Sequence, residues 1–354
     1  MNNETILSIS PSKTINETEL FMKYKSSYMS AFIDLSVYTF LMCSSFYSLW
    51  FFRNSWLSVF TVPLLGLLNL KTFIIFHDCG HNSYTPSKTL NNVIGIISGF
   101  FVQTPLSWSL RHDTHHATSG NTENKYDWRY NEHVYFTLSQ YKKFNVVKRY
   151  ITCFFITPEI FFMFAPLLNF FVLERVSFSK IIYRKISKTH VKLYWFLEQV
   201  INNIGVFYLN YILYRNSILA HWFIVMWIAT NLGVVLFHCQ HTYNPPYIVN
   251  NETWNVKDSG INGSSFIQIP YWLKYFTGNV EYHHIYHINA KIPSYNLQKY
   301  HKEVISKSNM FDNVVKLSMT DCYNNLWLVL YDEDKNRYIT FAEADEEIRK
   351  DKNA

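Results

Sequence analysis

The sequence predicts an all-α integral membrane protein with about four transmembrane helices in two hairpins, interfacial helices, and a cytosolic helical cap that carries a histidine-rich metal site. Three observations lead to this fold class. Aromatic residues make up 18% and charged residues only 16% of the 354 residues, whereas ordinary soluble domains carry roughly 25% charged residues. Long apolar stretches alternate with polar segments. Finally, 10 of the 14 histidines lie in four short windows.

The first predicted hairpin covers residues 31–52 and 56–76. Each stretch is apolar and long enough to cross a hydrocarbon core of roughly 30 Å. The polar break at 53–55 joins them, so we expect this turn on the far side of the membrane. Lys71, near the end of the second stretch, is expected to snorkel to the interface. Residues 1–30 are polar and lack an apolar signal core, which predicts an N-terminal tail without a cleaved signal peptide.

The second predicted hairpin covers residues 194–214 and 218–237, with a similar polar break at 215–217. Glu198 interrupts the first of these two stretches, so its first turns are expected outside the lipid. In both hairpins a histidine cluster follows the returning stretch. The two hairpins therefore deliver their histidines to one face of the membrane.

Two further apolar stretches, 93–110 and 150–173, contain prolines and polar residues. If either crossed the membrane alone, the histidine clusters would fall on opposite faces. We therefore expect both to be interfacial helices that lie in the interface or dip partway into the lipid.

The distribution of positive charge predicts the orientation. Each hairpin tip carries one arginine, whereas segments 125–149 and 174–192 are rich in lysine and arginine. By the positive-inside rule the histidine clusters face the cytosol. The protein is expected to be multi-pass, in the endoplasmic reticulum membrane if eukaryotic and in the inner membrane if bacterial. The net charge of +6 shows no basic–aromatic pattern typical of nucleic-acid binding, so no nucleic-acid partner is expected.

The sequence divides into the tail at 1–30, a membrane domain at 31–300 and a cytosolic C-terminal tail at 301–354 that packs on the cap. Within the cap, residues 271–289 are predicted to form one helix that carries the last histidine cluster. Residues 332–343 imitate a calcium-binding loop, but an arginine stands where such loops need glycine, so no calcium site is expected.

The histidine windows carry the chemistry. Spacings of three and four residues place imidazoles on one helical face. A cluster of histidines with few carboxylates suits iron, copper or zinc. Ten candidate nitrogens exceed the needs of one metal, so two metals that react with oxygen are the natural interpretation. The windows are residues 77–81, 112–116, 238–241 and 283–287.

In these motifs the chain resembles the membrane fatty acid desaturases. The matching segments are HDCGH at 77–81, HDTHH at 112–116, FHCQH at 237–241 and FTGNVEYHHIYHINAKIPSYNL at 276–297. The resemblance implies a non-haem di-iron centre that uses O₂ and two electrons to insert a cis double bond into an acyl chain. HDCGH and the long last motif at 276–297 look most like the acyl-lipid branch of the family, which acts at the Δ12 (ω6) position of oleoyl-type chains.

The resemblance also implies the residues of the site. Further metal candidates are His241, which matches a histidine after the last transmembrane stretch, and His238 and His284. Asp78, Asp113 and Glu281 are candidates for orienting the imidazoles or for helix capping. The histidines expected to bind iron and act in catalysis are His77, His81, His112, His115, His116, His283 and His287.

The sequence departs from the family at Tyr286. The family's third histidine motif, called the third box, reads His-x-x-His-His and falls here on residues 283–287, with Tyr286 in place of a histidine. Three interpretations follow: Tyr286 binds iron through its phenolate, His284 supplies the missing nitrogen, or one iron has fewer ligands.

The implied cofactors are two iron ions, with O₂ as co-substrate. The implied partners are an acyl-lipid or acyl-CoA substrate, the membrane lipids, and an external electron donor, cytochrome b5 or ferredoxin, because no fused haem-binding motif is present. Two other outcomes stay open: a hydroxylase, conjugase or acetylenase on the same scaffold, and an inactive lipid- or metal-binding protein. A metal transporter is disfavoured, because the histidine clusters flank the transmembrane stretches instead of lining a path through them.

Overall fold

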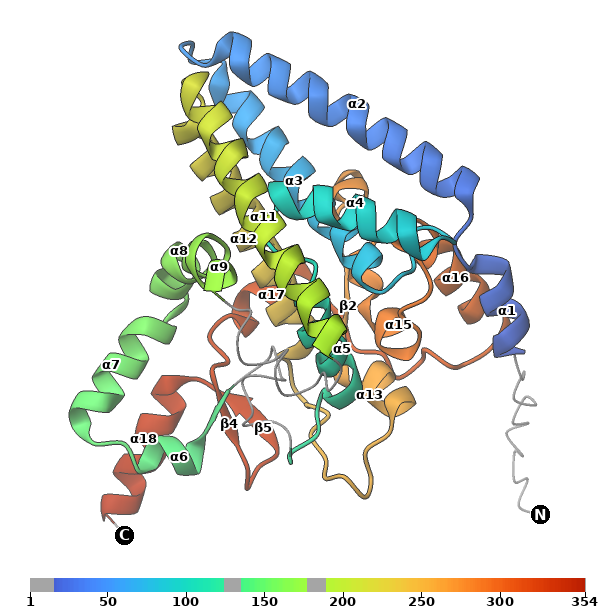
Figure 1. Cartoon of the computed structure of the whole chain (residues 1–354). Coiled ribbons are helices and arrows are strands. Elements are labelled where there is room, and N and C mark those ends of the chain that lie inside the picture. The colour runs from blue at the N-terminus through green and yellow to red at the C-terminus, as the bar shows by residue number, and fades with distance from the viewer. Residues whose placement is uncertain (1–15, 124–134, 177–188, 354) are drawn as a thin grey trace.

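The structure is a computed structural model that describes residues 16–123, 135–176 and 189–353. These residues are mostly helical. Long helices extend to one side, and a cap of shorter elements lies at their opposite end (Figure 1). Residues 1–15 of the predicted N-terminal tail and parts of the two basic segments lie outside the described residues.

The first hairpin consists of α2 (Tyr28–Phe52) and α3 (Ser58–Gly80). Helix α2 begins at Tyr28 because the Ser27 hydroxyl accepts a hydrogen bond from the backbone N–H of Ser30. Its outer face exposes large apolar side chains such as Phe32 and Phe40, as expected for contact with lipid. This is the hairpin that the sequence predicts.

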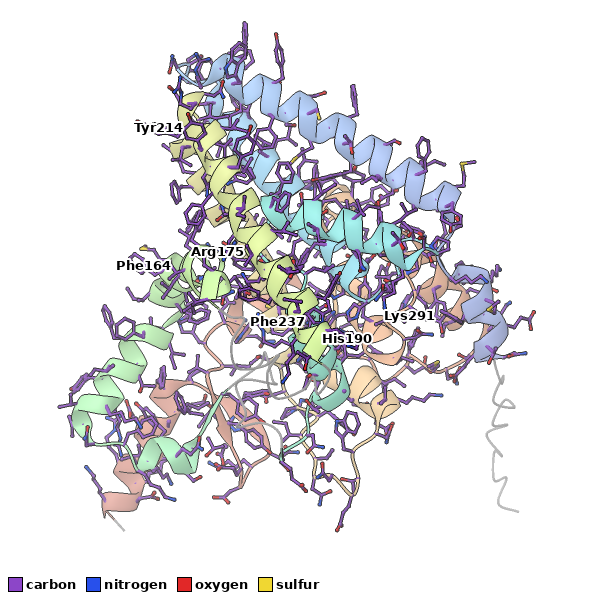
Figure 2. All side chains as sticks on the ribbon, in the orientation of Figure 1. Phe164, Arg175, His190, Tyr214, Phe237 and Lys291 are labelled. Carbon is purple, nitrogen blue, oxygen red and sulfur yellow. The ribbon has the colours of Figure 1, made fainter. Side chains whose placement is uncertain are left out.

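The second hairpin consists of α11 (Thr189–Arg215) and α12 (Leu219–His241). Helix α12 packs closely on α3, where a Cβ atom on Gly66 would come within 2.7 Å of Ile228 Cγ2. The tips of both hairpins lie at the same end of the molecule (Figure 1). Figure 2 shows Tyr214 at this end and Phe237 near the middle of the molecule, where the long helices meet the cap.

Three of the described helices, α2, α3 and α12, are long and apolar enough to cross a membrane. Helix α11 has 27 residues but is not among them. Its polar residues Glu198, Gln199 and Asn202 are buried inside the protein. The described residues thus contain three candidate membrane helices, or up to four if the bent pair of helices over residues 146–176 counts as one span. Helix α11 is in neither count, which agrees with the interruption predicted at Glu198.

The stretches expected to be interfacial form α4 (Lys88–Phe101), α7 (Val146–Ile156), α8 (Pro158–Leu168), the π-helix η1 (Asn169–Leu173) and α9 (Glu174–Val176). The chain bends by 72° between α7 and the following helices, so by length and composition together they are a candidate for a broken span or a re-entrant segment. Proline at the first position of α8 suits this break, because proline has no N–H to continue the preceding helix.

The cap contains short helices and two small sheets, ordered β1-β4-β5 and β2-β3. The sequence prediction of a helical cap did not include these strands. The helices are α1 (Glu17–Tyr24), α5 (Trp108–Thr118), α6 (Leu138–Lys142), α13 (Val256–Gly263), η2 (Tyr271–Leu273), α14 (Lys274–Thr277), η3 (Val280–Tyr282), α15 (His283–Ile288), α16 (Ser294–Lys307), α17 (Met319–Asn325) and α18 (Phe341–Asn353). The strands are β1 (Phe136–Thr137), β2 (Phe266–Ile267), β3 (Lys316–Leu317), β4 (Leu330–Asp332) and β5 (Arg337–Ile339).

The prediction of one helix over residues 271–289 was wrong. The backbone turns left-handed at Gly278 (φ +55°) and Asn279 (φ +60°), which separates α14 from η3 and α15. A Cβ atom on Gly278 would come within 2.6 Å of Ile74 Cγ2. The glycine therefore lets the chain pass close to α3 and places α15 against the end of the first hairpin.

The expectation that Lys71 snorkels to the interface was also wrong. The Lys71 side chain is buried, and its ammonium nitrogen lies 3.2 Å from the Asp34 carboxylate on α2. The second oxygen of Asp34 accepts a hydrogen bond from the Tyr84 hydroxyl at 3.0 Å. The antiparallel packing of the hairpin brings the two charges together, which the sequence of either helix alone does not reveal.

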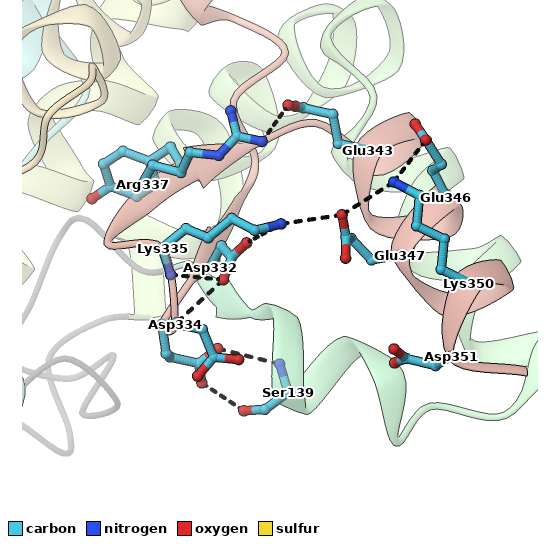
Figure 3. Close-up of polar contacts among 12 residues, drawn as sticks. Ser139, Asp332, Asp334, Lys335, Arg337, Glu343, Glu346, Glu347, Lys350 and Asp351 are labelled. Carbon is cyan, nitrogen blue, oxygen red and sulfur yellow. Dashed lines mark hydrogen bonds and ion pairs between the residues drawn. The ribbon is translucent and has the colours of Figure 1, made fainter. Parts of the chain in front are cut away.

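The segment that imitates a calcium loop is a β-hairpin between β4 and β5 (Figure 3). One oxygen of Asp332 accepts the backbone N–H groups of Asp334 and Lys335, which closes the turn. Glu343 accepts a hydrogen bond from Arg337 at 2.8 Å. Both carboxylates are thus engaged in contacts that stabilise the turn and the start of α18.

Candidate metal centre

The first histidine cluster joins α3 and α5. It consists of His77, His81, His112 and His116, whose candidate ligand nitrogens all lie within 4.8 Å of one another. The Nε2 atom of His112 lies 2.8 Å from Nε2 of His77 and 3.0 Å from Nε2 of His116. Residues four apart on each helix share one face, which is why both pairs point at the same place.

The second cluster joins α5, α12 and α15. It consists of His115, His241, His283 and His287, again with nitrogens within 4.8 Å of one another. Nε2 of His241 lies 3.1 Å from that of His115 and 3.0 Å from that of His283, and the Nε2 atoms of His283 and His287 are 3.1 Å apart. All four side chains are buried.

The two clusters lie side by side. The rings of His116 in the first cluster and His287 in the second have centroids 4.3 Å apart. Helix α5 supplies ligand candidates to both clusters, because His112 and His116 face one cluster and His115 faces the other. The arrangement offers two adjacent four-nitrogen sites.

The histidines fit metal ions better than they fit one another. A neutral imidazole carries one N–H. A ring whose Nε2 lies near the Nε2 atoms of two other rings therefore cannot form a hydrogen bond with both of them. His112, His241 and His283 are each in this position. A metal about 2.1 Å from each nitrogen would place neighbouring nitrogens about 3.0 Å apart at right angles, close to the distances found here.

Groups behind the rings hold several of them in place. Nδ1 of His77 lies 3.3 Å from the Asp78 carboxylate, and Nδ1 of His81 lies 3.1 Å from that of Asp113. His241 donates from Nδ1 to the backbone carbonyl of Gly263 at 3.1 Å. Such contacts fix the tautomer that leaves Nε2 for the metal.

The two aspartates were among the groups expected to orient imidazoles. The third, Glu281, instead pairs with Lys274 at 3.3 Å and accepts a hydrogen bond from Thr277. The Gly263 carbonyl was missed by the sequence analysis, since a backbone acceptor leaves no signal in the residue type.

Burial keeps the cap histidines neutral. It lowers the pKa of His112, His116, His283 and His287 well below the usual value, and the neighbouring imidazoles lower each pKa further. A neutral imidazole has the free lone pair that metal binding requires.

Tyr286 lies beside the first cluster, with its ring centroid 4.9 Å from that of His77. Its hydroxyl donates a hydrogen bond to Asp78 at 2.9 Å, and the backbone N–H of Ser294 donates to the other oxygen of Asp78 at 2.7 Å. Burial, together with the nearby Asp78, raises the pKa of Tyr286 well above its usual value. The phenol is therefore protonated and bound to Asp78.

Two predicted candidates lie outside both clusters. His238 donates from Nε2 to the backbone carbonyl of Asn325 at 2.9 Å. The ring of His284 points away from the centre, with Nε2 3.1 Å from Nδ1 of His301. The structure thus brings eight of the ten clustered histidines together.

The comparisons with known proteins agree with these motifs. The family described as fatty acid desaturase matches residues 54–313, which contain all eight clustered histidines. A fatty acid desaturase of Bacillus subtilis is 30% identical over 309 residues, covering 84% of this chain and 82% of the relative.

More distant relatives carry more specific names. A chloroplastic omega-6 fatty acid desaturase of Arabidopsis thaliana is 24% identical over 282 residues, covering 76% of this chain and 58% of the relative. An sn-1 acyl-lipid omega-3 desaturase (ferredoxin) of Synechocystis is 36% identical over 108 residues, covering 29% of each chain. The match that spans most of the chain and the eight histidines gathered at the ends of its apolar helices together establish that this chain belongs to the fatty acid desaturase family.

Proposed function

We propose that the chain is an acyl-lipid desaturase that inserts a cis double bond at the Δ12 (ω6) position of an oleoyl-type chain. Family membership already implies an oxidoreductase that acts on fatty acyl chains. The names of the plant relatives support the ω6 position. The ligands in this proposal are His77, His81, His112 and His116 for one iron and His115, His241, His283 and His287 for the other.

The single observation that carries the proposal is the convergence of two four-histidine clusters at the end of the apolar helices. Bound iron would supply the redox chemistry that activates O₂ to break unactivated C–H bonds. The reaction balances as one O₂, two electrons and two protons taken up, two hydrogens removed from adjacent carbons, and two waters released.

The protein's own residues do the rest. Asp78, Asp113 and the Gly263 carbonyl hold imidazole rings in the tautomer that presents Nε2. Burial of the clusters keeps water from the reacting carbon, and the helix ends fix the depth at which an acyl chain meets the site.

The electrons would come from an external donor, ferredoxin or cytochrome b5. The ferredoxin in the name of the Synechocystis relative supports the first choice. We propose that the histidine clusters face the cytosol. The segments rich in lysine and arginine, 125–149 and 174–192, fall on the same side of the predicted hairpins as the clusters.

The test is expression in a host with a simple fatty acid profile, followed by gas chromatography of its lipids and iron analysis of the purified protein. A new dienoic acid in cells that express the chain, lost in His283→Ala, is the expected result. A hydroxylated acid would instead assign the hydroxylase reaction on the same scaffold.

The inactive alternative makes a different prediction in the same experiment. If the chain is inactive, the purified protein contains normal iron, but cells supplied with an electron donor make no new acyl product. Each cluster has four histidines without a contribution from Tyr286, which favours the active enzyme.

A further inference from the structure

The turn that leads into α5, the helix that carries His112, His115 and His116, is held by a residue of another helix. The N-cap residue of α5, Ser107, makes no side-chain capping bond. The first N–H groups of α5 bond carbonyls three residues back, which makes a tight first turn. The two N–H groups just before the helix are held by α11: the Glu198 carboxylate accepts the backbone N–H of Leu106 at 2.7 Å and that of Ser107 at 3.2 Å.

Glu198 is 2% exposed. A carboxylate buried in this way is costly unless hydrogen bonds or opposite charge compensate it. Two N–H groups and the positive end of the α5 dipole provide that compensation. The residue that broke the apolar pattern of α11 in the sequence thus has a specific partner 91 and 92 residues away along the chain.

Further contacts hold the same segment. Arg111 on α5 donates to Glu174 on α9 at 2.8 Å. On α11, the Asn202 side chain donates to the backbone carbonyl of Thr104 at 3.1 Å. Arg175 reaches from α9 to Asn202 at 2.8 Å, and Figure 2 shows Arg175 beside α11. Helices α9 and α11 therefore hold both the entry to α5 and its first turn.

The entry to α5 is directly connected to the metal centre. Trp108, the residue after Ser107, stacks on the ring of His112 with centroids 4.4 Å apart and an interplanar angle of 18°. The same short helix carries candidate ligands of both clusters. A shift or rotation at its start changes the direction of all three imidazoles.

We propose that Glu198 is a positioning residue for the metal centre: by holding the N-terminus of α5 it sets the geometry of both metal sites at once. The inference rests on the proposed function, since it presumes that the clusters bind metal. It adds a residue that lies outside every histidine box.

The test uses the full-length protein in detergent, with cobalt(II) as the probe. Cobalt reports ligand geometry through its visible absorption, and titration gives affinity and stoichiometry. In Glu198→Ala we expect at least about tenfold weaker cobalt binding at both sites, the lower end of the range for groups that orient metal ligands, and an altered spectrum. Glu198→Gln, which keeps one acceptor oxygen, should lie between this variant and the wild type.

The matched control is Glu252→Gln, which removes one carboxylate charge at an exposed position of the cap and should leave cobalt binding unchanged. Asn202→Ala, which removes the bond to Thr104 and the bond from Arg175 but leaves Glu198 in place, serves as the second variant if Glu198→Ala does not fold. A smaller change in the same direction is expected.

The outcomes are distinguishable. If the wild type binds cobalt at both sites and folded Glu198→Ala and Glu198→Gln show the same affinity and spectrum, the positioning role is overturned and the proposed function stands. A lower melting temperature with an unchanged cobalt spectrum also overturns it, since that is the signature of a purely structural residue. If wild type and His283→Ala bind equally little cobalt, both proposals fall.

Discussion

Replacing Tyr286 by phenylalanine tests how the irregular third box works. The change removes one hydroxyl and keeps the ring that packs against His77. The lost hydrogen bond to Asp78 is buried and 2.9 Å long. Hydrogen bonds to charged groups contribute about 1.5–3 kcal/mol. Because Asp78 keeps the N–H of Ser294 and its contact with His77, we expect a loss near the lower end, about 1.5 kcal/mol.

The assay is thermal unfolding in detergent, combined with iron analysis and acyl-product profiles. A loss of this size corresponds to a melting temperature lower by about 3 °C. Iron content and the position of the new double bond should not change. The control is Tyr282→Phe on the same segment, whose hydroxyl contacts Lys274 instead of Asp78. It should be destabilised less, because that contact is longer, at 3.3 Å.

The reasoning is refuted if Tyr286→Phe loses iron or changes product while its melting temperature stays that of the wild type. That result would make the phenol oxygen a metal ligand. Tyr286→His gives an independent check: it places a nitrogen donor next to His77, so we expect the spectrum of the first site to change and that of the second to stay the same.

Three further predictions concern single positions. Among the described residues, His115 is the only ligand candidate that α5 contributes to the second cluster. His115→Ala should therefore lower the iron content toward about one per chain, and unchanged iron content would argue against this ligand set. Lys71→Ala leaves the Asp34 carboxylate without its 3.2 Å partner and should cost about 3 kcal/mol, measured as a lower melting temperature; a double variant with Asp34→Asn should recover most of it, and failure to do so would show that the pair is not the cause. Gly278→Ala places a Cβ atom on a left-handed backbone and within 2.6 Å of Ile74, so it should lower the free energy of unfolding by about 1–2 kcal/mol. Gly263→Ala, whose Cβ atom would have its nearest neighbour at 3.5 Å, should be tolerated. Equal effects of the two substitutions would contradict the strain argument.

The sequence was informative where the signal is local. Apolar length predicted the two hairpins, and the spacing within each window predicted which imidazoles share a helical face. His112 and His115 illustrate the limit, because one helix turns them toward different clusters. Which cluster each ring joins depends on α12 and α15, which are distant in sequence.

Contacts between distant segments account for the errors. Lys71 looked like an interfacial residue because its partner Asp34 lies on another helix. Residues 271–289 looked like one helix because helix periodicity does not register the close approach to α3 that Gly278 permits. Glu198 looked like an interruption of an apolar stretch, since its partners Leu106 and Ser107 are backbone groups.

The placement of α5 between the two clusters has a consequence for how this segment can vary. Each residue turns an α-helix by about 100°, so one inserted or deleted residue between His112 and His115 would swing His115 and His116 away from their clusters. Substitutions within the helix preserve this angular relation, but changes of length do not. The number of residues in the box is therefore as strict a requirement as the histidines themselves.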